Sequence, residues 1–275
     1  MPKTIIAANL FLVNDAIPVD VEEAFQHLRS AVKASKANNT IISVSVLPSE
    51  KQALATKFSD NFIQWRDLTT HQKLPRIGEI IGNAVDLSDP NDLIIYLNAD
   101  INVPHYFLDF VRININALPT GSGLVINRKD VTGIRDADLM ASNFSARPHI
   151  GFDCMAFPAT NARDFELGSV TVGLPPIGSL VVSNMLSLLP YCHLLNDALI
   201  TWHNGTGDES AWHHESYQDQ IKQNFLASFE ALNTLFTNPK ANKNFRHMTQ
   251  TKNFIALYKK WLSSTSSSIT GNKSQ

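Results

Sequence analysis

The sequence has few cysteines and almost no net charge, and both shortages exclude classes of protein. Cys154 and Cys192 are the only two cysteines in 275 residues, and neither belongs to a CxxC pair. They cannot make a disulfide framework, so we expect a reducing compartment and a cytoplasmic location. Lys+Arg 23 against Asp+Glu 25 gives a formal net charge of −2. The chain therefore has no global positive field for nucleic acid, and we expect no nucleic-acid partner.

Long apolar runs are also missing. A helix that spans a bilayer needs about 20 consecutive apolar residues. The best candidate, from Gly178 to Cys192, is interrupted by serines, an asparagine and a proline. The first residues carry no export signal and have the pattern of a strand. With 44% hydrophobic residues, the chain is expected to form a soluble protein with a sizeable core and no transmembrane segment.

About the first hundred residues alternate between β-rich apolar runs and helical patterns, which favours the α/β class. Expected strands lie at 4–13, 40–47, 62–68, 93–97 and 123–131, and expected helices at 19–38, 48–60, 74–88 and 104–118. The run Leu93–Leu97 is apolar without alternation, which is typical of a central strand covered on both faces. The pattern predicts a mixed sheet with helices on both faces.

Beyond residue 140 the pattern becomes irregular, and we expect short strands among loops with one small-residue helix at 181–189. The C-terminal part, from Tyr217 to Leu262, has helical spacing. We therefore divide the chain into a main domain at 1–215, a C-terminal helical extension at 216–262 and a polar tail at 263–275 that is expected to be disordered.

Polar residues follow the central strand abruptly, as Asn98-Ala99-Asp100-Ile101-Asn102. In open α/β sheets, ligands bind beyond the carboxyl ends of the strands. Short side chains that carry oxygen on such a turn are suitable donors for Mg²⁺ or Mn²⁺. The alternative is an Asx turn that caps the following helix.

At this point the stretch LPRIGEIIGNAVDLSDPNDLIIYLNADI (74–101) resembles the GT-A nucleotide-sugar glycosyltransferases, in which a hydrophobic strand ends in a DxD-type motif. In that family the motif holds a divalent metal that bridges the donor diphosphate. The resemblance implies that Asp100 and Asn102 bind Mn²⁺ or Mg²⁺. Asn98 stands where the family has its first Asp, so Asp100 is the one carboxylate of the motif.

Two later segments extend the resemblance. HIGFDCMAFPA (149–159) is similar to the family's segment that supplies a strand and a carboxylate near the acceptor, which implies a role for Asp153 as a hydroxyl acceptor or general base. LITWHNGTGDESAW (199–212) looks like the C-terminal element whose His completes the metal shell. This implies His203 as a metal ligand and Asp208 as a second candidate catalytic carboxylate. The alternatives are a turn Asp before a buried strand and a surface hairpin with a polar tip.

Four further residues are expected to contact the donor. Arg76, at the start of a helix, could bind phosphates with bidentate geometry. Asn83 lies where similar glycosyltransferases often carry an Asn, Asn9 lies within the expected first strand, and Asn98 follows the central strand. Arg76 and Asn83 also fit ordinary exposed helix positions.

The resemblance implies a glycosyltransferase that moves a sugar from a UDP- or GDP-linked donor to a hydroxyl of a glycan or lipid-linked glycan, with metal assistance. Peripheral contact of the C-terminal helices with a membrane is compatible with this. The main alternative is a GT-A-like protein that binds a sugar or nucleotide with little or no turnover. A sugar-1-phosphate nucleotidyltransferase is disfavoured because no Gly-rich, Arg-containing loop follows the first strand. A ligand-free interaction protein is a further alternative.

Overall fold

The structure is a computed structural model, and its described part excludes several segments of the chain. The described residues are 2–11, 16–35, 39–45, 56–64, 75–131, 147–149, 151–196, 199–205 and 217–241. Most of the helix expected at 48–60, the candidate Asp208 and everything after 241 lie outside these residues.

Sixteen helices and strands are formed by the described residues. In chain order they are β1 (Thr4–Ala8), α1 (Val19–Ala34), β2 (Asn39–Ser45), β3 (Asn61–Gln64), α3 (Ile77–Asp86), β4 (Leu93–Leu97), α4 (Phe107–Asn116), β5 (Gly123–Ile126), β6 (Lys129–Val131), β7 (Arg147–Pro148), β8 (Cys154–Pro158), α5 (Ala159–Ala162), α6 (Ile177–Leu188), β9 (Cys192–Leu195), β10 (Trp202–Asn204) and α7 (Gln218–Thr237). No helix in this part of the chain is long and apolar enough to cross a membrane.

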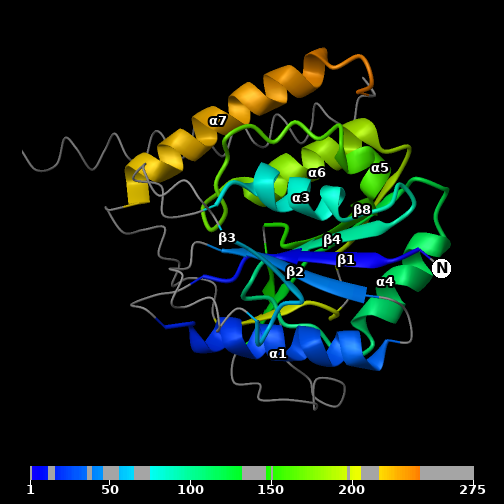
Figure 1. The fold of residues 1–275 in the computed structure, drawn as a ribbon. Helices are drawn as coiled ribbons and strands as arrows, with labels where there is room; N and C mark the ends of the chain where they lie inside the picture. Colours follow the sequence, from blue (N-terminus) through cyan, green and yellow to red (C-terminus); the bar gives the residue numbers. More distant parts are fainter. Residues whose placement is uncertain are drawn as a thin grey trace, which may run out of the picture.

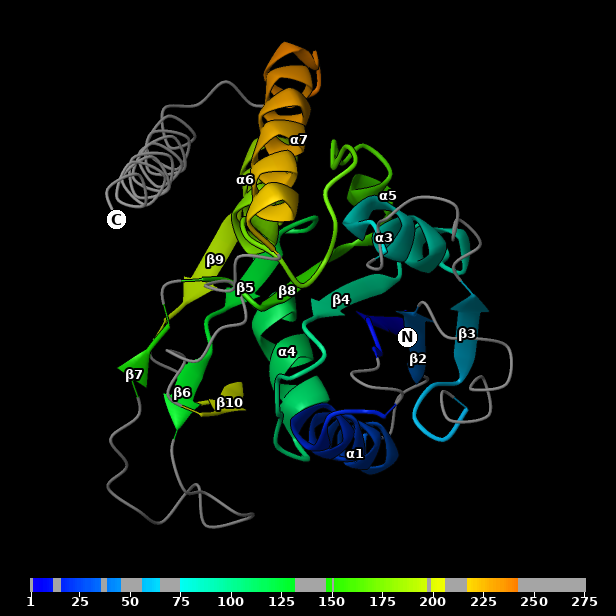
Figure 2. The same ribbon diagram turned by 90° about the vertical axis from the view of Figure 1, so that its left-hand side faces the viewer.

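Seven of the described strands form the central sheet, in the order β3-β2-β1-β4-β8-β5-β9. The strands are parallel except β8, which runs antiparallel to both of its neighbours, β4 and β5. A smaller sheet of order β10-β6-β7 lies beside β5 (Figure 2). The mixed α/β architecture expected from the sequence is confirmed.

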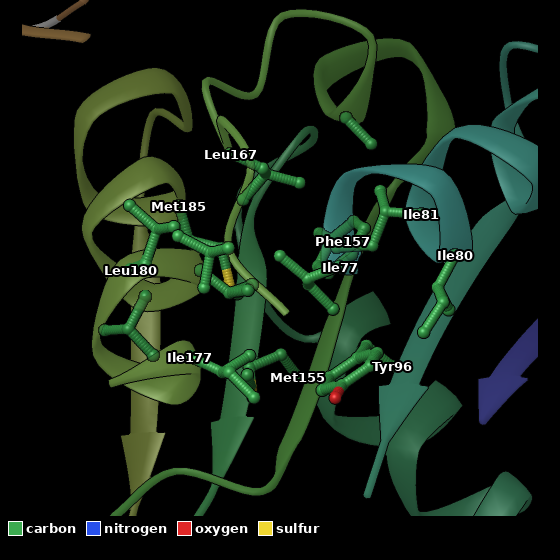
Figure 3. Packing of buried hydrophobic residues seen from close by; sticks show 14 of the residues in the cluster. Ile77, Ile80, Ile81, Tyr96, Met155, Phe157, Leu167, Ile177, Leu180 and Met185 are labelled. Atoms are coloured by element: carbon green, nitrogen blue, oxygen red, sulfur yellow. The ribbon is translucent and has the colours of Figure 1, made fainter. Parts of the chain in front are cut away.

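Helices cover both faces of the central sheet (Figure 1). Alternate residues of one strand enter different cores, as the two-residue period of a strand requires. Ile94 and Tyr96 pack with α3, α6 and α7, whereas Ile95 and Leu97 pack with α1 and α4. Figure 3 shows the first of these cores, where Tyr96 lies among apolar side chains. The central strand is therefore buried on both sides, as its unbroken apolar run predicts.

One expected strand is interrupted. The segment 123–131 was expected to be continuous, but it forms β5 in the central sheet and β6 in the small sheet. Asn127 and Arg128 lie at the break. Its cause is visible in the sequence, because the apolar run ends at Ile126 and polar residues follow directly. The strand leaves the central sheet where it no longer has apolar side chains for the two cores.

The helix α7 packs against the segment 171–175 through a buried amide. Asn224, 3% exposed, accepts hydrogen bonds from the backbone N–H and the hydroxyl of Thr171, and donates to the carbonyls of Thr171, Leu174 and Pro175. Thr171 also forms a β-bridge with Arg76. The helix α7 thus supports the segment that positions the start of α3.

Replacing Asn224 with Leu should destabilise the protein by roughly 2 to 3 kcal/mol, because the buried N–H and carbonyl groups of 171–175 lose their partner. Urea unfolding followed by circular dichroism measures this change. Asn116→Ala, on the exposed end of α4, is the matched control, with an expected effect within about 0.5 kcal/mol. Equal effects of the two substitutions would show that Asn224 does not anchor α7.

Candidate functional site

The pairing register of β4, β5 and β8 brings the first residues of the site together. Leu97 of β4 and Ile126 of β5 both pair with Cys154 of β8. The next residue beyond the strands is polar on each side, so Asn98 and Asp153 become neighbours across β4 and β8. Their backbones are joined by a bond from the Asn98 N–H to the Asp153 carbonyl, 2.9 Å. The antiparallel β8 therefore brings Asp153 to the end of the sheet where the parallel strand β4 ends.

Carboxylates and imidazoles alternate across this edge. His203 Nε2 lies 3.6 Å from Asp100 Oδ2, and His203 Nδ1 lies 3.6 Å from Asp130 Oδ1. His149 Nδ1 is 3.4 Å from Asp130 Oδ2, and its Nε2 is 3.8 Å from Asp153 Oδ2. We call these five residues the acid–histidine cluster. The cluster joins the turn after β4 to the start of β8.

A buried guanidinium borders the cluster. Arg128 Nε lies 3.0 Å from Asp130 Oδ1 and 3.4 Å from Asp153 Oδ2. Its Nη2 lies 3.3 Å from His149 Nδ1. Arg128 is 8% exposed, and the break between β5 and β6 places it here. Among the described side chains, two carboxylates of the cluster, Asp130 and Asp153, lie beside this guanidinium, and the third, Asp100, faces His203. Three carboxylates in the presence of one guanidinium favour added positive charge.

The pKa of Asp153 is raised to about 6. Burial is the main cause, because the charged form loses water; Asp100 and Asp130 also raise the pKa, while Arg128 and the bond from Asn98 lower it. Burial lowers the pKa of His149, and Arg128 lowers it further against the effect of Asp130. Asp153 therefore changes charge near pH 6, so that at neutral pH it is ionised and can serve as a general base.

Two glycines make room for the two histidines. A Cβ atom on Gly151 would lie 2.6 Å from His149 Nε2, and one on Gly205 would lie 3.1 Å from the His203 ring. Gly205 also has a φ of 149°, which L side chains rarely adopt. The HxG pattern at His149 and at His203 thus has a steric cause.

Asp100 and His203 come from distant parts of the chain and fit one metal ion as two of its ligands, because a carboxylate oxygen and an imidazole nitrogen both suit Mn²⁺. The side chain of Asp100 is 31% exposed. Within the described residues, no three His, Cys, Asp or Glu side chains form a group that could hold a metal ion. The protein supplies a partial ligand set in this region.

The other two residues of the 98–102 motif face elsewhere. Asn102 was expected to bind metal, but its Oδ1 lies 2.8 Å from the ring nitrogen Nδ1 of His27, and its backbone pairs with Trp202. Asn98 was expected to contact the donor, but its amide binds Tyr96 on one side and Asp153 on the other. Only Asp100 of the three is directed toward His203.

The remaining candidates lie on other elements. Asn9 follows β1 directly, and Arg76 immediately precedes α3. Asn83 lies in the second half of α3, where its carbonyl bonds the N–H of Leu87. Among the described residues, no hydrogen bond or ion pair joins Asn83 to the cluster, and its contact with the donor stays a prediction. Asp208 lies outside the described residues.

Several buried polar atoms that make no hydrogen bond belong to residues predicted to form the site. Among the described residues, nine buried side-chain nitrogen or oxygen atoms have no hydrogen-bond partner. Five of them belong to predicted site residues: Asn9 Oδ1, Arg76 Nε, Asn102 Nδ2, Asp153 Oδ2 and His203 Nδ1. Buried polar groups are nearly always hydrogen-bonded in proteins, so atoms of this kind are candidates for contact with a ligand or water. Two of the five have a charged neighbour instead of a hydrogen bond: Asp153 Oδ2 lies near Arg128, and His203 Nδ1 lies near Asp130.

Sequence reasoning missed Arg128, Asp130 and the function of His149 in the cluster. The signal for the first two was the polar run 127–130 directly after the apolar run 123–126, which is the same pattern that identified 98–102. A groove of about 440 Å³ between α3 and 162–168 is lined by none of the cluster residues, so it is a separate feature.

No protein-family model and no curated protein matches the chain. Among solved structures, TarS from S. aureus in complex with UDP-GlcNAc matches with a TM-score of 0.52 and 9% identity, over 84% of this chain and 66% of that chain. The mannosyltransferase PcManGT from Pyrobaculum calidifontis, in complex with GDP-Man and Mn²⁺, has a TM-score of 0.49 and 10% identity, over 98% and 81%. The chain spans just under two thirds of the TarS structure's length.

The fold is GT-A-like. Of these two matches only the TarS structure exceeds a TM-score of 0.5, and it supports the mainly parallel sheet with helices on both faces. The resemblance seen in the sequence is thus confirmed for the fold. Because identity is about one tenth, activity has to be argued from the site itself.

Gly151→Ala and Gly82→Ala should change stability in opposite directions. The Gly151 substitution pushes the His149 ring out of the cluster and should cost about 1 to 2 kcal/mol. Gly82 lies within α3 with nothing within 4 Å of an added Cβ, so Ala there should stabilise by about 0.5 to 1 kcal/mol. Thermal and urea unfolding of both variants measure the difference. A neutral Gly151→Ala would contradict the steric account of the HxG pattern.

Proposed function

We propose that the protein is a glycosyltransferase that moves a sugar from a nucleotide-diphosphate donor to a hydroxyl acceptor. One observation carries the proposal: Asp100 and His203, more than a hundred positions apart, face each other at 3.6 Å beside a buried carboxylate, Asp153. The GT-A-like fold supports the same class of donor. A cytoplasmic location stays a prediction.

The donor is proposed to bind along the edge formed by the ends of β1 and β4 and the start of α3. Asn9 Oδ1 and Arg76 Nε are buried without partners there. The amide oxygen can accept from an N–H of a nucleobase, and a guanidinium suits a diphosphate. UDP- and GDP-linked sugars are both compatible with these groups.

Asp100 and His203 would hold a divalent metal, Mn²⁺ or Mg²⁺, at this edge. When bound, such an ion supplies positive charge for the departing diphosphate. The protein's own contribution is to keep the two ligands together: Gly205 leaves space for the His203 ring, and Asp130 faces the other ring nitrogen. The excess of carboxylates in the cluster favours the cation.

Asp153 is proposed to receive the acceptor hydroxyl. Its Oδ1 accepts from the Asn98 amide, whereas its buried Oδ2 accepts no hydrogen bond. An ionised Oδ2 could orient the hydroxyl and take its proton as the sugar is transferred. Glycan or lipid-linked glycan acceptors both carry such hydroxyls. Asp208 is retained as a second candidate carboxylate.

A second candidate function is binding of a nucleotide sugar with little or no turnover. It is favoured by the absence, within the described part of the chain, of a three-residue group that could hold a metal. The two functions differ in catalysis, because a binding protein would be stabilised by the donor but would neither transfer nor hydrolyse the sugar.

A thermal-shift screen of UDP- and GDP-linked sugars, with and without Mn²⁺, should find a donor that stabilises the protein. Asp100→Ala and His203→Ala should lower the Mn²⁺-dependent affinity for the donor by about 10- to 100-fold. The lower affinity is measured as a smaller thermal shift at the same donor concentration. Exposed Asp86 and the β9 residue His193 provide matched controls, Asp86→Ala and His193→Ala, which should respond as the wild type does. An equal response in all four variants would place the donor site elsewhere.

Asp153→Asn should lower kcat by about 100-fold or more while the donor still binds, because the amide cannot accept the proton. In the wild type, activity should rise as pH increases through about 6, since ionisation of Asp153 produces the basic form. The pH profile of initial transfer rates measures this. A profile that is flat between pH 5 and 8 would argue against Asp153 as the base.

A further inference from the structure

We propose that Asn98 is a positioning residue that holds Asp153 in place, and not a ligand of metal or donor. The proposal rests on the function proposed above for Asp153. It concerns the position at which the DxD-type motif has its first acidic residue. The oxygen and the nitrogen of the Asn98 amide each already make a hydrogen bond within the protein.

The contacts define the orientation of the amide. Asn98 Nδ2 donates to Asp153 Oδ1 at 2.5 Å, and the Tyr96 hydroxyl donates to Asn98 Oδ1 at 2.8 Å. Because a carboxylate only accepts, the amide nitrogen must face Asp153, and the amide oxygen must then face the Tyr96 hydroxyl. Tyr96 itself is 2% exposed and is fixed in the core. A buried tyrosine therefore sets the direction of the bond to Asp153.

The same contacts explain why an acidic residue does not suit position 98. A carboxylate there would face the buried Asp153 carboxylate at hydrogen-bond distance, and two carboxylates that close cannot both ionise readily. Burial already raises the pKa of Asp153, and the bond from Asn98 opposes that rise. Asn98 therefore favours the ionised form that the proposed chemistry needs.

Asp153 faces charged or titratable groups on several other elements. They are Tyr96 on β4, Asp100 on the following turn, Arg128 between β5 and β6, Asp130 on β6, and His149 after β7. Arg128 is the one cation in this set with a fixed charge. It acts on Oδ2, whereas Asn98 acts on Oδ1, so the two residues hold different oxygens of the same carboxylate.

The test compares Asn98→Asp and Asn98→Leu with the wild type, and uses Asn116→Asp on the exposed end of α4 as the matched control. Three quantities are measured: the titration of Asp153 by carboxyl NMR, Mn²⁺ affinity by calorimetry with the metal alone, and the pH profile of transfer. Asn98→Leu should raise the Asp153 midpoint by about one pH unit, which lowers transfer about tenfold below that midpoint and little above it. Asn98→Asp should raise it further without tightening Mn²⁺ binding.

Two results would overturn the proposal. One is a tenfold tighter Mn²⁺ affinity with faster transfer in Asn98→Asp, because residue 98 would then behave as a metal ligand. The other is an unchanged Asp153 midpoint in Asn98→Leu. If these variants do not fold, Tyr96→Phe removes only the hydroxyl that orients the amide, and it should shift the midpoint in the same direction by less.

The NMR titration separates this proposal from the proposed function. If the wild type transfers no sugar but the Asp153 midpoint still moves in the Asn98 variants, the positioning role holds and the glycosyltransferase function fails. If transfer occurs with a pH profile that the Asn98 variants do not move, the function holds and the positioning role fails.

Discussion

The site depends on one antiparallel strand in an otherwise parallel sheet. Because β8 runs against β4 and β5, its first residue meets their last ones, and Asp153 lies next to Asn98 and close to Arg128. A parallel strand in the same place would have brought its carboxyl end, with Pro158, to this edge instead. The pairing register of β4, β8 and β5 therefore brings the charged residues of the site together. The two apolar cores on either side of β4 stabilise that register.

The sequence predicted the structure best where the burial of apolar residues alone determined the outcome. The unbroken apolar run at 93–97 predicted a doubly covered strand, and the polar residues after it predicted a site, because apolar runs have to be buried and ligands bind at strand ends. The pairing of Asp100 with His203 was expected from the order of motifs and is present at 3.6 Å. The GT-A-like fold is likewise confirmed.

The parts that were missed depend on contacts distant in sequence. Nothing local indicates that Asn98 faces Asp153, since this requires knowing that β8 is antiparallel. Asn102 could not be separated from Asp100 by spacing alone; His27 on α1 engages it, and that contact joins residues 75 positions apart. Arg128 was hidden because 123–131 has the pattern of one strand, while the structure divides it between two sheets.

The division of 123–131 between two sheets affects how the sheets can move relative to each other. The same short stretch of backbone belongs to the central sheet up to Ile126 and to the small sheet from Lys129, so Arg128 is attached to both bodies. Any tilt of the small sheet carries Asp130 and His203 with it, while Asp153 and Asn98 stay with the central sheet. Arg128 forms ion pairs with Asp130 on the small sheet and with Asp153 on the central sheet. The strength of these two ion pairs therefore limits how far the two halves of the cluster can separate.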